Sequence, residues 1–577
     1  MDGSAECCPS RSHRNAFQDA SFWGATAFGT ILSIAITGYA FPDNNNVFHL
    51  PIVGELYNLP ELAADPYIQS LRHFASGLWM ILEGSARWID PRLLFFILLL
   101  ASRALSLIGF LLCADWLGIR DAGARYVFAA LVATSALMQI DSVAGGGGLF
   151  IRNFTHSELP NGIFLIALWC ILTGRFRVAL MLIGPTFFLN AFFAVWQTFI
   201  LAIVLLNEVL SGRQRIRDLI PDIAIGAMIG ILFAIPILQN IIRNPDFGAR
   251  LDFNYIDYVG TYYFRHFLFW PIRPWEKVTL LCVVGVTLYS LRLSSDPQNR
   301  LLVTVWACIA LYVIGIFVPA ITSNPTIINL HLLRSSTLIQ LQTVLLASVV
   351  ITRWWFSNSN RAIVLASLAM VGMAIAPIGP LRLLGIGSLV AIFAIQQLVE
   401  RYPNSWPAPW LLWDARVVRA AALVALTLVA GATILVNQWR IARDSEWIVE
   451  WDQVARWARR DTAAGSVFLV PVFSFTKTYT GKDLERQGAI LNGAFEYTAH
   501  RSLWIDFKRG ANVMWSPSDY HRWRERTEAV EQLSTHQERL EYAMAHGIPY
   551  VIEFTMSNCS EQPVFRTGRI CVFRSML

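Results

Sequence analysis

Long apolar runs alternate with shorter polar segments over most of the chain, and this alternation predicts a bundle of membrane helices. A helix needs about 20 apolar residues to cross the hydrocarbon core of a bilayer. Runs near this length lie at about 22–40, 93–114, 126–143, 160–173, 178–190, 192–210, 219–238, 277–291, 301–319, 335–352, 362–378, 382–399 and 419–437. We therefore predict about thirteen spans. A broken or re-entrant hairpin is the alternative for the short pair between 178 and 210.

The arginines between these runs fall on one side of the predicted bundle when the spans alternate. They lie before the first span and in every second connection: Arg11, Arg14, Arg120, Arg125, Arg175, Arg177, Arg213, Arg215, Arg217, Arg292, Arg300, Arg353, Arg361, Arg401, Arg416 and Arg419. Cytoplasmic loops are enriched in arginine and lysine. Residues 1–21 are therefore expected to be a cytoplasmic tail. An odd number of crossings then places the chain after about residue 440 outside the cytoplasm.

The last part of the chain changes to the pattern of a soluble α/β domain. Charged residues become frequent, and short apolar runs that predict strands alternate with helical patterns. Strands are predicted at 466–471, 503–507, 550–554 and 570–573, and helices at 446–463 and 518–545. The predicted division is a membrane domain at 22–439, with large outer loops at 41–92, 141–160 and 239–276, followed by an extracytoplasmic α/β domain at 440–577.

Composition agrees with this class. The chain has 577 residues, of which 55% are hydrophobic and 15% charged, which is too apolar for a soluble protein of this size. The net charge of +6 is mild and its basic residues are scattered, so nothing points to nucleic acid. Cys559 and Cys571 bracket a short loop of the outer domain and are expected to form a disulfide in an oxidising compartment. No CxxC, HExxH or Walker pattern is present.

The first outer loop begins with an unusual concentration of polar groups. Asp43, three asparagines and His49 follow the first span directly, in the run PDNNNVFHLP. Ionisable groups at a membrane boundary often mark a functional site. A solvated cap at a helix end is the alternative, because Asp and Asn are common there.

Further polar groups lie on the same predicted side. Asp141, Arg152 and Glu158 belong to the second outer loop, which also carries four consecutive glycines at 145–148. Those glycines either allow backbone to approach a ligand closely or form a flexible turn. His331 and Arg334 stand at the start of a predicted span. Arg103 lies inside the second span, where it is expected to face a cavity or a carboxylate unless the span boundary is shifted.

These features resemble the GT-C superfamily of membrane glycosyltransferases that use polyprenyl-phosphate sugars. The resemblance rests on the many spans, the long first outer loop that begins with an acidic residue, the polar second outer loop and the outer α/β domain. The runs DNNNVFHLP, ADPYIQS and FEYTAHRSLWIDFK more narrowly resemble an uncharacterised group of bacterial membrane proteins with that architecture. The resemblance covers nearly the whole chain, although its motifs are short.

The resemblance implies an inverting sugar transfer outside the cytoplasm, from a lipid-linked donor to a glycan, lipid or protein acceptor, in a bacterial inner membrane. Asp43 falls where the family has its candidate general base, and His49 is placed with it. Arg334, His331 and Arg152 are the expected donor-phosphate ligands, because guanidinium groups bind phosphate bidentately. Asp141, Glu158 and Arg103 are expected to support the site. The second loop lacks the acidic pair of metal-dependent members, so no metal site is assigned and a divalent metal is the less favoured alternative.

Two other functional classes are also compatible with the sequence. A lipid or polysaccharide transporter would also need many spans and buried charges, although internal repeats would be expected. A non-catalytic assembly protein would keep the same fold and pair its loop charges with one another. Neither the donor sugar nor the acceptor can be read from the sequence.

Overall fold

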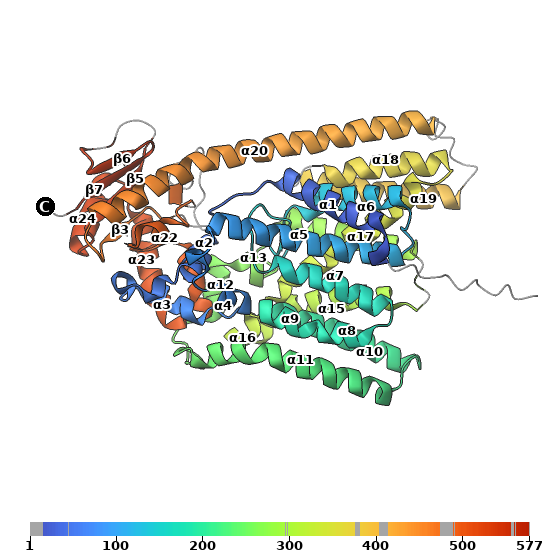
Figure 1. Cartoon of the computed structure of the whole chain (residues 1–577), viewed down its shortest axis with the longest axis horizontal. Helices are drawn as coiled ribbons and strands as arrows, with labels where there is room; N and C mark the ends of the chain where they lie inside the picture. The colour runs from blue at the N-terminus through green and yellow to red at the C-terminus, as the bar shows by residue number, and fades with distance from the viewer. Residues whose placement is uncertain are drawn as a thin grey trace, which may run out of the picture.

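The chain folds into a long bundle of helices with a small mixed domain at one end (Figure 1). The structure is a computed structural model, and it describes residues 16–43, 45–294, 296, 298–375, 381–402, 414–472, 488–489, 491–555, 559 and 561–575. Residues 1–15 of the expected cytoplasmic tail, which include Arg11 and Arg14, lie outside the described residues.

Most of the predicted apolar runs correspond to helices. The bundle consists of α1 (Ala20–Thr37), α5 (Pro91–Trp116), α6 (Ala122–Thr134), α7 (Glu158–Leu172), α8 (Phe176–Met181), α9 (Ile183–Leu189), α10 (Ala191–Leu210), α11 (Ile216–Arg243), α14 (Pro274–Arg292), α15 (Arg300–Ile321), α17 (Ser336–Trp355), α18 (Asn360–Ala374), α19 (Leu381–Arg401) and α20 (Ala415–Asp461). Within the described part of the chain, eight helical segments are long and apolar enough to cross a membrane, and four shorter apolar helices accompany them. The protein is therefore an integral membrane protein.

The predicted span at 126–143 is wrong at its carboxyl end, because helix α6 stops at Thr134. Ser135 leaves the helical conformation, with φ −58° and ψ 124°, and its hydroxyl accepts a hydrogen bond from the Leu137 amide. The apolar residues that follow form a 3-10 turn and a short hairpin of β1 (Ile140–Asp141) and β2 (Gly148–Leu149). Apolar composition alone cannot separate a span from an irregular segment buried inside the protein.

Helix α20 joins the membrane domain without a break to the small mixed domain, which we call the outer domain after its predicted location. Its 47 residues correspond to about 70 Å at 1.5 Å per residue, more than twice the hydrocarbon core of a bilayer. Its first half is largely exposed along the edge of the bundle, whereas Trp447, Trp451 and Val454 in its second half are buried against the outer domain. The predicted boundary at residue 440 thus falls inside one continuous helix, and the helix predicted at 446–463 is the last part of α20, which ends at Asp461.

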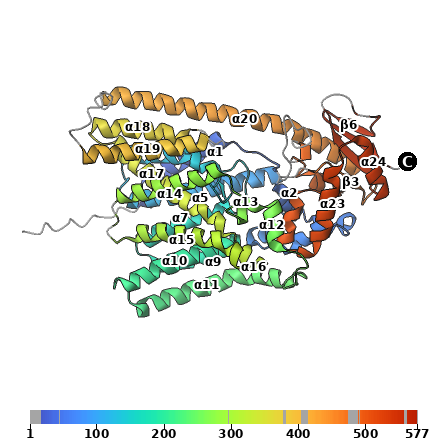
Figure 2. The same cartoon turned by 180° about the vertical axis from the view of Figure 1, so that it is seen from behind.

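The large outer loops fold into short helices at the same end of the bundle as the outer domain, as the two opposite views show (Figures 1 and 2). The first loop contains α2 (Asn46–Val53), α3 (Pro66–Ser70) and α4 (Gly77–Leu82). The loop after α11 contains α12 (Tyr255–Tyr262) and α13 (Phe264–Phe267), and the connection after α15 contains α16 (Pro325–Ile328). These segments share apolar clusters with the outer domain; Tyr258, for example, packs with Trp523. The loops and the domain thus form one packed layer on the end of the bundle.

The outer domain is built on a five-stranded sheet of order β4-β3-β5-β7-β6. Its strands are β3 (Val467–Leu469), β4 (Ser502–Leu503), β5 (Tyr550–Phe554), β6 (Phe565–Thr567) and β7 (Ile570–Arg574). Strands β4, β3 and β5 are parallel, and β5, β7 and β6 are antiparallel. Helices α22 (Phe495–Ala499), α23 (Tyr520–Gln532) and α24 (His536–Ala545) complete the domain. The structure joins Cys559 to Cys571, which lies in β7.

Candidate functional site

Asp43 lies in the turn between α1 and α2, and its carboxylate makes few hydrogen bonds within that turn. The Asn46 side chain accepts a hydrogen bond from the Asp43 amide at 2.5 Å, and the Asn46 amide donates to the Asp43 carbonyl at 2.8 Å. The Asp43 carboxylate accepts one bond of 3.3 Å, from the Asn45 amide. The residue at the N-cap of α2 is Asn45, not Asp43. The geometry therefore does not favour a capping role for Asp43.

The outer domain closes over this turn. A Cβ atom at Gly493 would stand 2.5 Å from the Asp43 carbonyl oxygen, so glycine is needed for the close approach. Lys508, from the same domain, lies with its ammonium nitrogen 5.8 Å from the centre of the Phe48 ring in α2. The outer domain thus brings a cation to the loop that carries Asp43.

Asp141 is positioned by the glycine-rich hairpin, which packs tightly against the start of α17. A Cβ atom at Gly145 would collide with the Leu333 carbonyl and the Ser336 hydroxyl. Added bulk at Gly147 would collide with Thr337. Of the two interpretations of the glycine run, a flexible turn is therefore wrong. Its glycines let backbone lie close to another helix.

Side chains from other helices fix this hairpin. Gln340 accepts a hydrogen bond from the Val143 amide at 3.1 Å, and the Tyr312 hydroxyl donates to the Ala144 carbonyl at 2.7 Å. Arg382 donates to the Asp141 carbonyl at 2.8 Å, and His266 Nδ1 lies 3.2 Å from the Gly145 carbonyl. The backbone of the second outer loop is therefore held in one arrangement on the helix entrance that carries Arg334.

Four charged side chains gather here without direct partners: Asp43, Asp141, Arg334 and Lys508. Each is half-buried. Among the residues that the structure describes, none of the four makes a salt bridge, and the bond from the Asn45 amide is the one hydrogen bond to any of their charged groups. Arg334 has the Phe192 ring as a neighbour, with 5.7 Å between its guanidinium carbon and the ring centre. We call these four residues the charged cluster.

The pKa shifts show that the cluster is coupled through space. Burial lowers the pKa of Lys508, and the negative charge of Asp43 acts most strongly in the opposite direction. Burial raises the pKa of Asp141, whereas the charges of Arg265, Arg334, Arg382 and Lys508 oppose that rise. Charges withdrawn from water are costly unless something pairs with them. The cluster is thus suited to a charged ligand.

The histidines near the cluster are held neutral. His49 is 3% exposed and stacks on Trp79, with 4.0 Å between the ring centres. Burial lowers its pKa well below the usual range. Burial also lowers the pKa of His156 to about 4 and that of His266 to about 3. A general base must reach the acceptor, and His49 instead packs inside an aromatic cluster. The geometry therefore does not support a catalytic role for His49 beside Asp43.

His331 lies on the same turn as Arg334 but contacts rings. It is buried between Phe192 and Phe267, with ring centres 4.9 Å and 4.5 Å away, and its φ of 50° is left-handed. Such a backbone conformation is strained for a residue other than glycine and persists where packing enforces it. The contacts indicate that His331 positions the entrance of α17 rather than binding phosphate itself.

Arg152 does not join the cluster. It forms a salt bridge of 3.0 Å with Asp444 of α20 and lines a cavity of about 260 Å³ together with Thr37, Asn437 and Arg440. The expectation that Arg152 binds the same phosphate as Arg334 is therefore not supported by the geometry.

Arg103 and Glu158 form a buried pair. Their charged atoms are 3.6 Å apart, with side chains 0% and 4% exposed, inside α5 and at the start of α7. Glu158 also accepts hydrogen bonds of 3.0 Å from Ser102 and from the Ile151 amide. Of the two interpretations of Arg103, the shifted span boundary is wrong. The pair fixes the carboxyl end of the second outer loop.

Lys508 is the member of the cluster that sequence reasoning missed. It ends the run FEYTAHRSLWIDFK that carried part of the resemblance, and it follows a predicted strand. Its place beside the first outer loop depends on a contact between segments hundreds of residues apart. No group of three or more metal-ligating side chains occurs within the described ranges.

Comparison with known proteins adds little. No family model matches the chain, and no curated protein matches it. Among solved structures it is similar to the crystal structure of ArnT from Cupriavidus metallidurans bound to undecaprenyl phosphate. The sequences are 12% identical, the TM-score is 0.41, and the match covers 96% of this chain and 97% of that chain. A similarity this low does not carry function from one protein to the other.

Proposed function

We propose that the protein is a GT-C-type membrane glycosyltransferase that moves a sugar from a polyprenyl-phosphate donor to an acceptor outside the cytoplasm. The observation that carries the proposal is the charged cluster. Two cations and two carboxylates, half-buried and without direct partners, lie where the helix bundle meets the outer domain. A lipid phosphate could enter from the bilayer and be neutralised there, and a polar acceptor could approach from the outer side.

In the proposed reaction Asp43 is the general base. Its carboxylate accepts the proton of an acceptor hydroxyl while that oxygen attacks the anomeric carbon of the donor sugar. The bond between the anomeric carbon and the phosphate oxygen breaks, and the electron pair leaves with the lipid phosphate. Attack opposite the leaving group inverts the anomeric configuration.

Arg334 and Lys508 are proposed to bind the donor phosphate. The phosphate gains one negative charge as the sugar leaves, and two nearby cations stabilise that charge more strongly in a site shielded from water. Arginine offers a planar fork for two phosphate oxygens, and lysine offers a point charge. Asp141 faces both cations electrostatically and is proposed to orient them.

The first test is binding of the lipid product. The purified protein in nanodiscs is titrated with undecaprenyl phosphate, and with undecaprenol as the ligand that lacks the charge. We expect Arg334→Gln and Lys508→Gln each to weaken undecaprenyl phosphate binding roughly 10- to 100-fold, the range for losing a charge-assisted hydrogen bond. Arg152→Gln is the matched control and should bind as the wild type does. Equal binding of undecaprenol would contradict a phosphate site.

Turnover separates the enzyme from its rivals. Release of undecaprenyl phosphate from a panel of undecaprenyl-phosphate sugars, in the presence of envelope glycans, is measured by mass spectrometry. Acceptor-dependent release supports the transferase. Phosphate-dependent binding without release by the wild type, across the panel, would instead favour a non-catalytic assembly protein or a transporter.

A further inference from the structure

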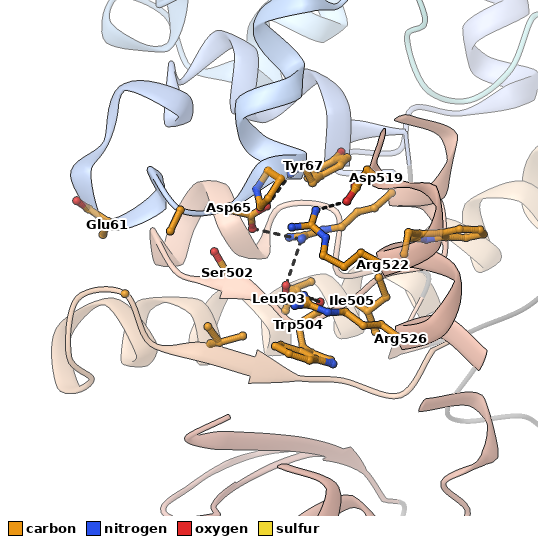
Figure 3. Close-up of a pocket in the computed structure, with 16 residues that line it drawn as sticks. Glu61, Asp65, Tyr67, Ser502, Leu503, Trp504, Ile505, Asp519, Arg522 and Arg526 are labelled. Carbon is orange, nitrogen blue, oxygen red and sulfur yellow. Dashed lines mark hydrogen bonds and ion pairs between the residues drawn. The ribbon is translucent and has the colours of Figure 1, made fainter. Parts of the chain in front are cut away.

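A second polar pocket lies between the first outer loop and the outer domain (Figure 3). Its volume is about 210 Å³, and its walls come from residues 61–67 and from 502–526, together with Gly465 and Val467. None of its lining residues belongs to the charged cluster. What it binds is therefore a question separate from the proposed transfer reaction.

Arginines crowd one end of this pocket. Arg522 is paired with Asp519, and Arg509 lies 3.3 Å from Asp65. Arg526 lies over the Trp504 ring, with 3.4 Å from its guanidinium carbon to the ring centre.

Arg526 lacks a carboxylate of its own. Among the described residues, its one hydrogen bond is donated by Nη1 to the Trp504 carbonyl at 3.2 Å, and it makes no salt bridge. A guanidinium group has five N–H donors, so most of those of Arg526 remain for a ligand. Burial lowers the pKa of Arg526 and the charge of Arg522 lowers it further, whereas Asp519 and Asp65 act in the opposite direction. These two carboxylates are already paired with Arg522 and Arg509, so a ligand carboxylate could pair with Arg526 directly.

The other end of the pocket offers oxygen acceptors. Figure 3 shows Glu61 at the far side from Arg526, with Ser502 between them. Glu61 is 23% exposed, and its carboxylate lies 3.5 Å from Nδ1 of His500. A carboxylate accepts hydrogen bonds from hydroxyl groups, and a serine hydroxyl both donates and accepts. Among its described residues, the pocket therefore has one arginine without a paired carboxylate at one end, and groups suited to hydroxyls at the other.

We propose that this pocket binds one acidic sugar residue. The carboxylate of the sugar would pair with Arg526, and its hydroxyls would donate to Glu61 and Ser502. The volume lies below the roughly 300–1,000 Å³ of pockets for drug-sized ligands, which fits a single ring. Because the walls come from both the first loop and the outer domain, a bound sugar would also link these two parts.

The experiment uses glucuronic acid as the probe, with glucose and glucosamine for comparison, on the purified full-length protein. Calorimetry and saturation-transfer NMR measure binding. We expect glucuronic acid to bind the wild type and to bind Arg526→Gln roughly 10- to 100-fold more weakly. Arg524→Gln is the matched control, because Arg524 lies on the same helix but is 48% exposed and pairs with Glu528. That variant should bind like the wild type.

Ala64→Trp provides a test that leaves the arginines in place. Ala64 is exposed and lines the pocket, so an indole there should block entry without disturbing the core. Thermal unfolding checks that each variant is folded. The proposal is overturned if the wild type does not bind glucuronic acid or binds glucose or glucosamine equally well. It is also overturned if folded Arg526→Gln or Ala64→Trp binds glucuronic acid as the wild type does. Asp43→Asn should leave this binding unchanged, whatever its effect on sugar transfer.

Discussion

Asp43 and Asp90 are both acidic residues next to a helix of the outer face, but only one of them caps it. Asp90 accepts a 2.7 Å bond from the Arg92 amide at the start of α5, whereas Asp43 precedes the N-cap of α2. Asn caps a helix about as well as Asp does. Asp90→Asn should therefore change neither stability nor turnover.

Asp43→Asn should lower turnover by about 10²–10⁴-fold, the usual contribution of a general base. Undecaprenyl phosphate binding and the thermal unfolding midpoint should stay close to those of the wild type, because the backbone bonds of the turn remain. The measurement is the initial rate of sugar transfer by Asp43→Asn, compared with the rate of the Asp90→Asn variant. Equal rates for the two variants would remove Asp43 from the reaction.

Three of the four residues of the charged cluster could be proposed as site residues from the sequence alone. Asp43, Asp141 and Arg334 could be proposed because an ionisable side chain next to an apolar run is unusual. Lys508 carries no such signal, since a lysine in a polar domain is ordinary. His49 and Arg152 looked equally suitable, and only the positions of Trp79 and Asp444 show that they have other contacts.

The β1–β2 hairpin is the element on which the cluster depends most directly. Gly145→Ala should place a methyl group against the Leu333 carbonyl and the Ser336 hydroxyl. Such overpacking typically costs about 1–3 kcal/mol. We expect a lower unfolding midpoint and weaker undecaprenyl phosphate binding, because Arg334 lies next to Leu333. Both are measured on the protein in nanodiscs.

Gly148→Ala is the control for that hairpin. The nearest atom to its added methyl group would be the end of the Ile151 side chain at 3.2 Å, which can move. This variant should therefore lose much less stability than Gly145→Ala. Equal stability and binding of both variants would mean that the hairpin tolerates bulk and that its packing does not position the cluster.

The elements show where sequence patterns succeed and where they fail. Apolar runs predict the helices of the bundle because a bilayer demands both length and apolarity. The same rule fails for 135–143, where irregular backbone is buried inside the protein and Gln340 satisfies its polar groups. It also fails at residue 440, since helix α20 continues through a change in composition. Local patterns cannot anticipate a polar partner that arrives from another helix.

The disulfide of the outer domain joins Cys559 to strand β7 and should contribute to the stability of the whole protein. Cys559 and Cys571 are 12 residues apart, and closing a loop of that size typically stabilises a fold by about 2–4 kcal/mol. We expect both cysteines to resist alkylation in native membranes until a reductant is added. Cys282, which is a free thiol, is the control, and it should be alkylated in denatured protein without reduction. Cys559→Ser should lower the unfolding midpoint. Mass spectrometry that finds both cysteines alkylated without reduction would reject the pairing.

The orientation of the whole molecule decides whether this chemistry takes place outside the cytoplasm. The arginine-rich connections predict that the end opposite the outer domain faces the cytoplasm, and the first outer loop, α12, α13 and the outer domain share the other end (Figure 1). Alkaline phosphatase is active only after export, so a fusion at the carboxyl terminus should be active, and a green fluorescent protein fusion there should be dark. The reverse result would put the charged cluster on the cytoplasmic side, where thiols are kept reduced. Cys559 and Cys571 would then also be found as free thiols. The fusion reporters and the cysteine alkylation must therefore agree. The proposed reaction requires that both place the outer domain outside the cytoplasm.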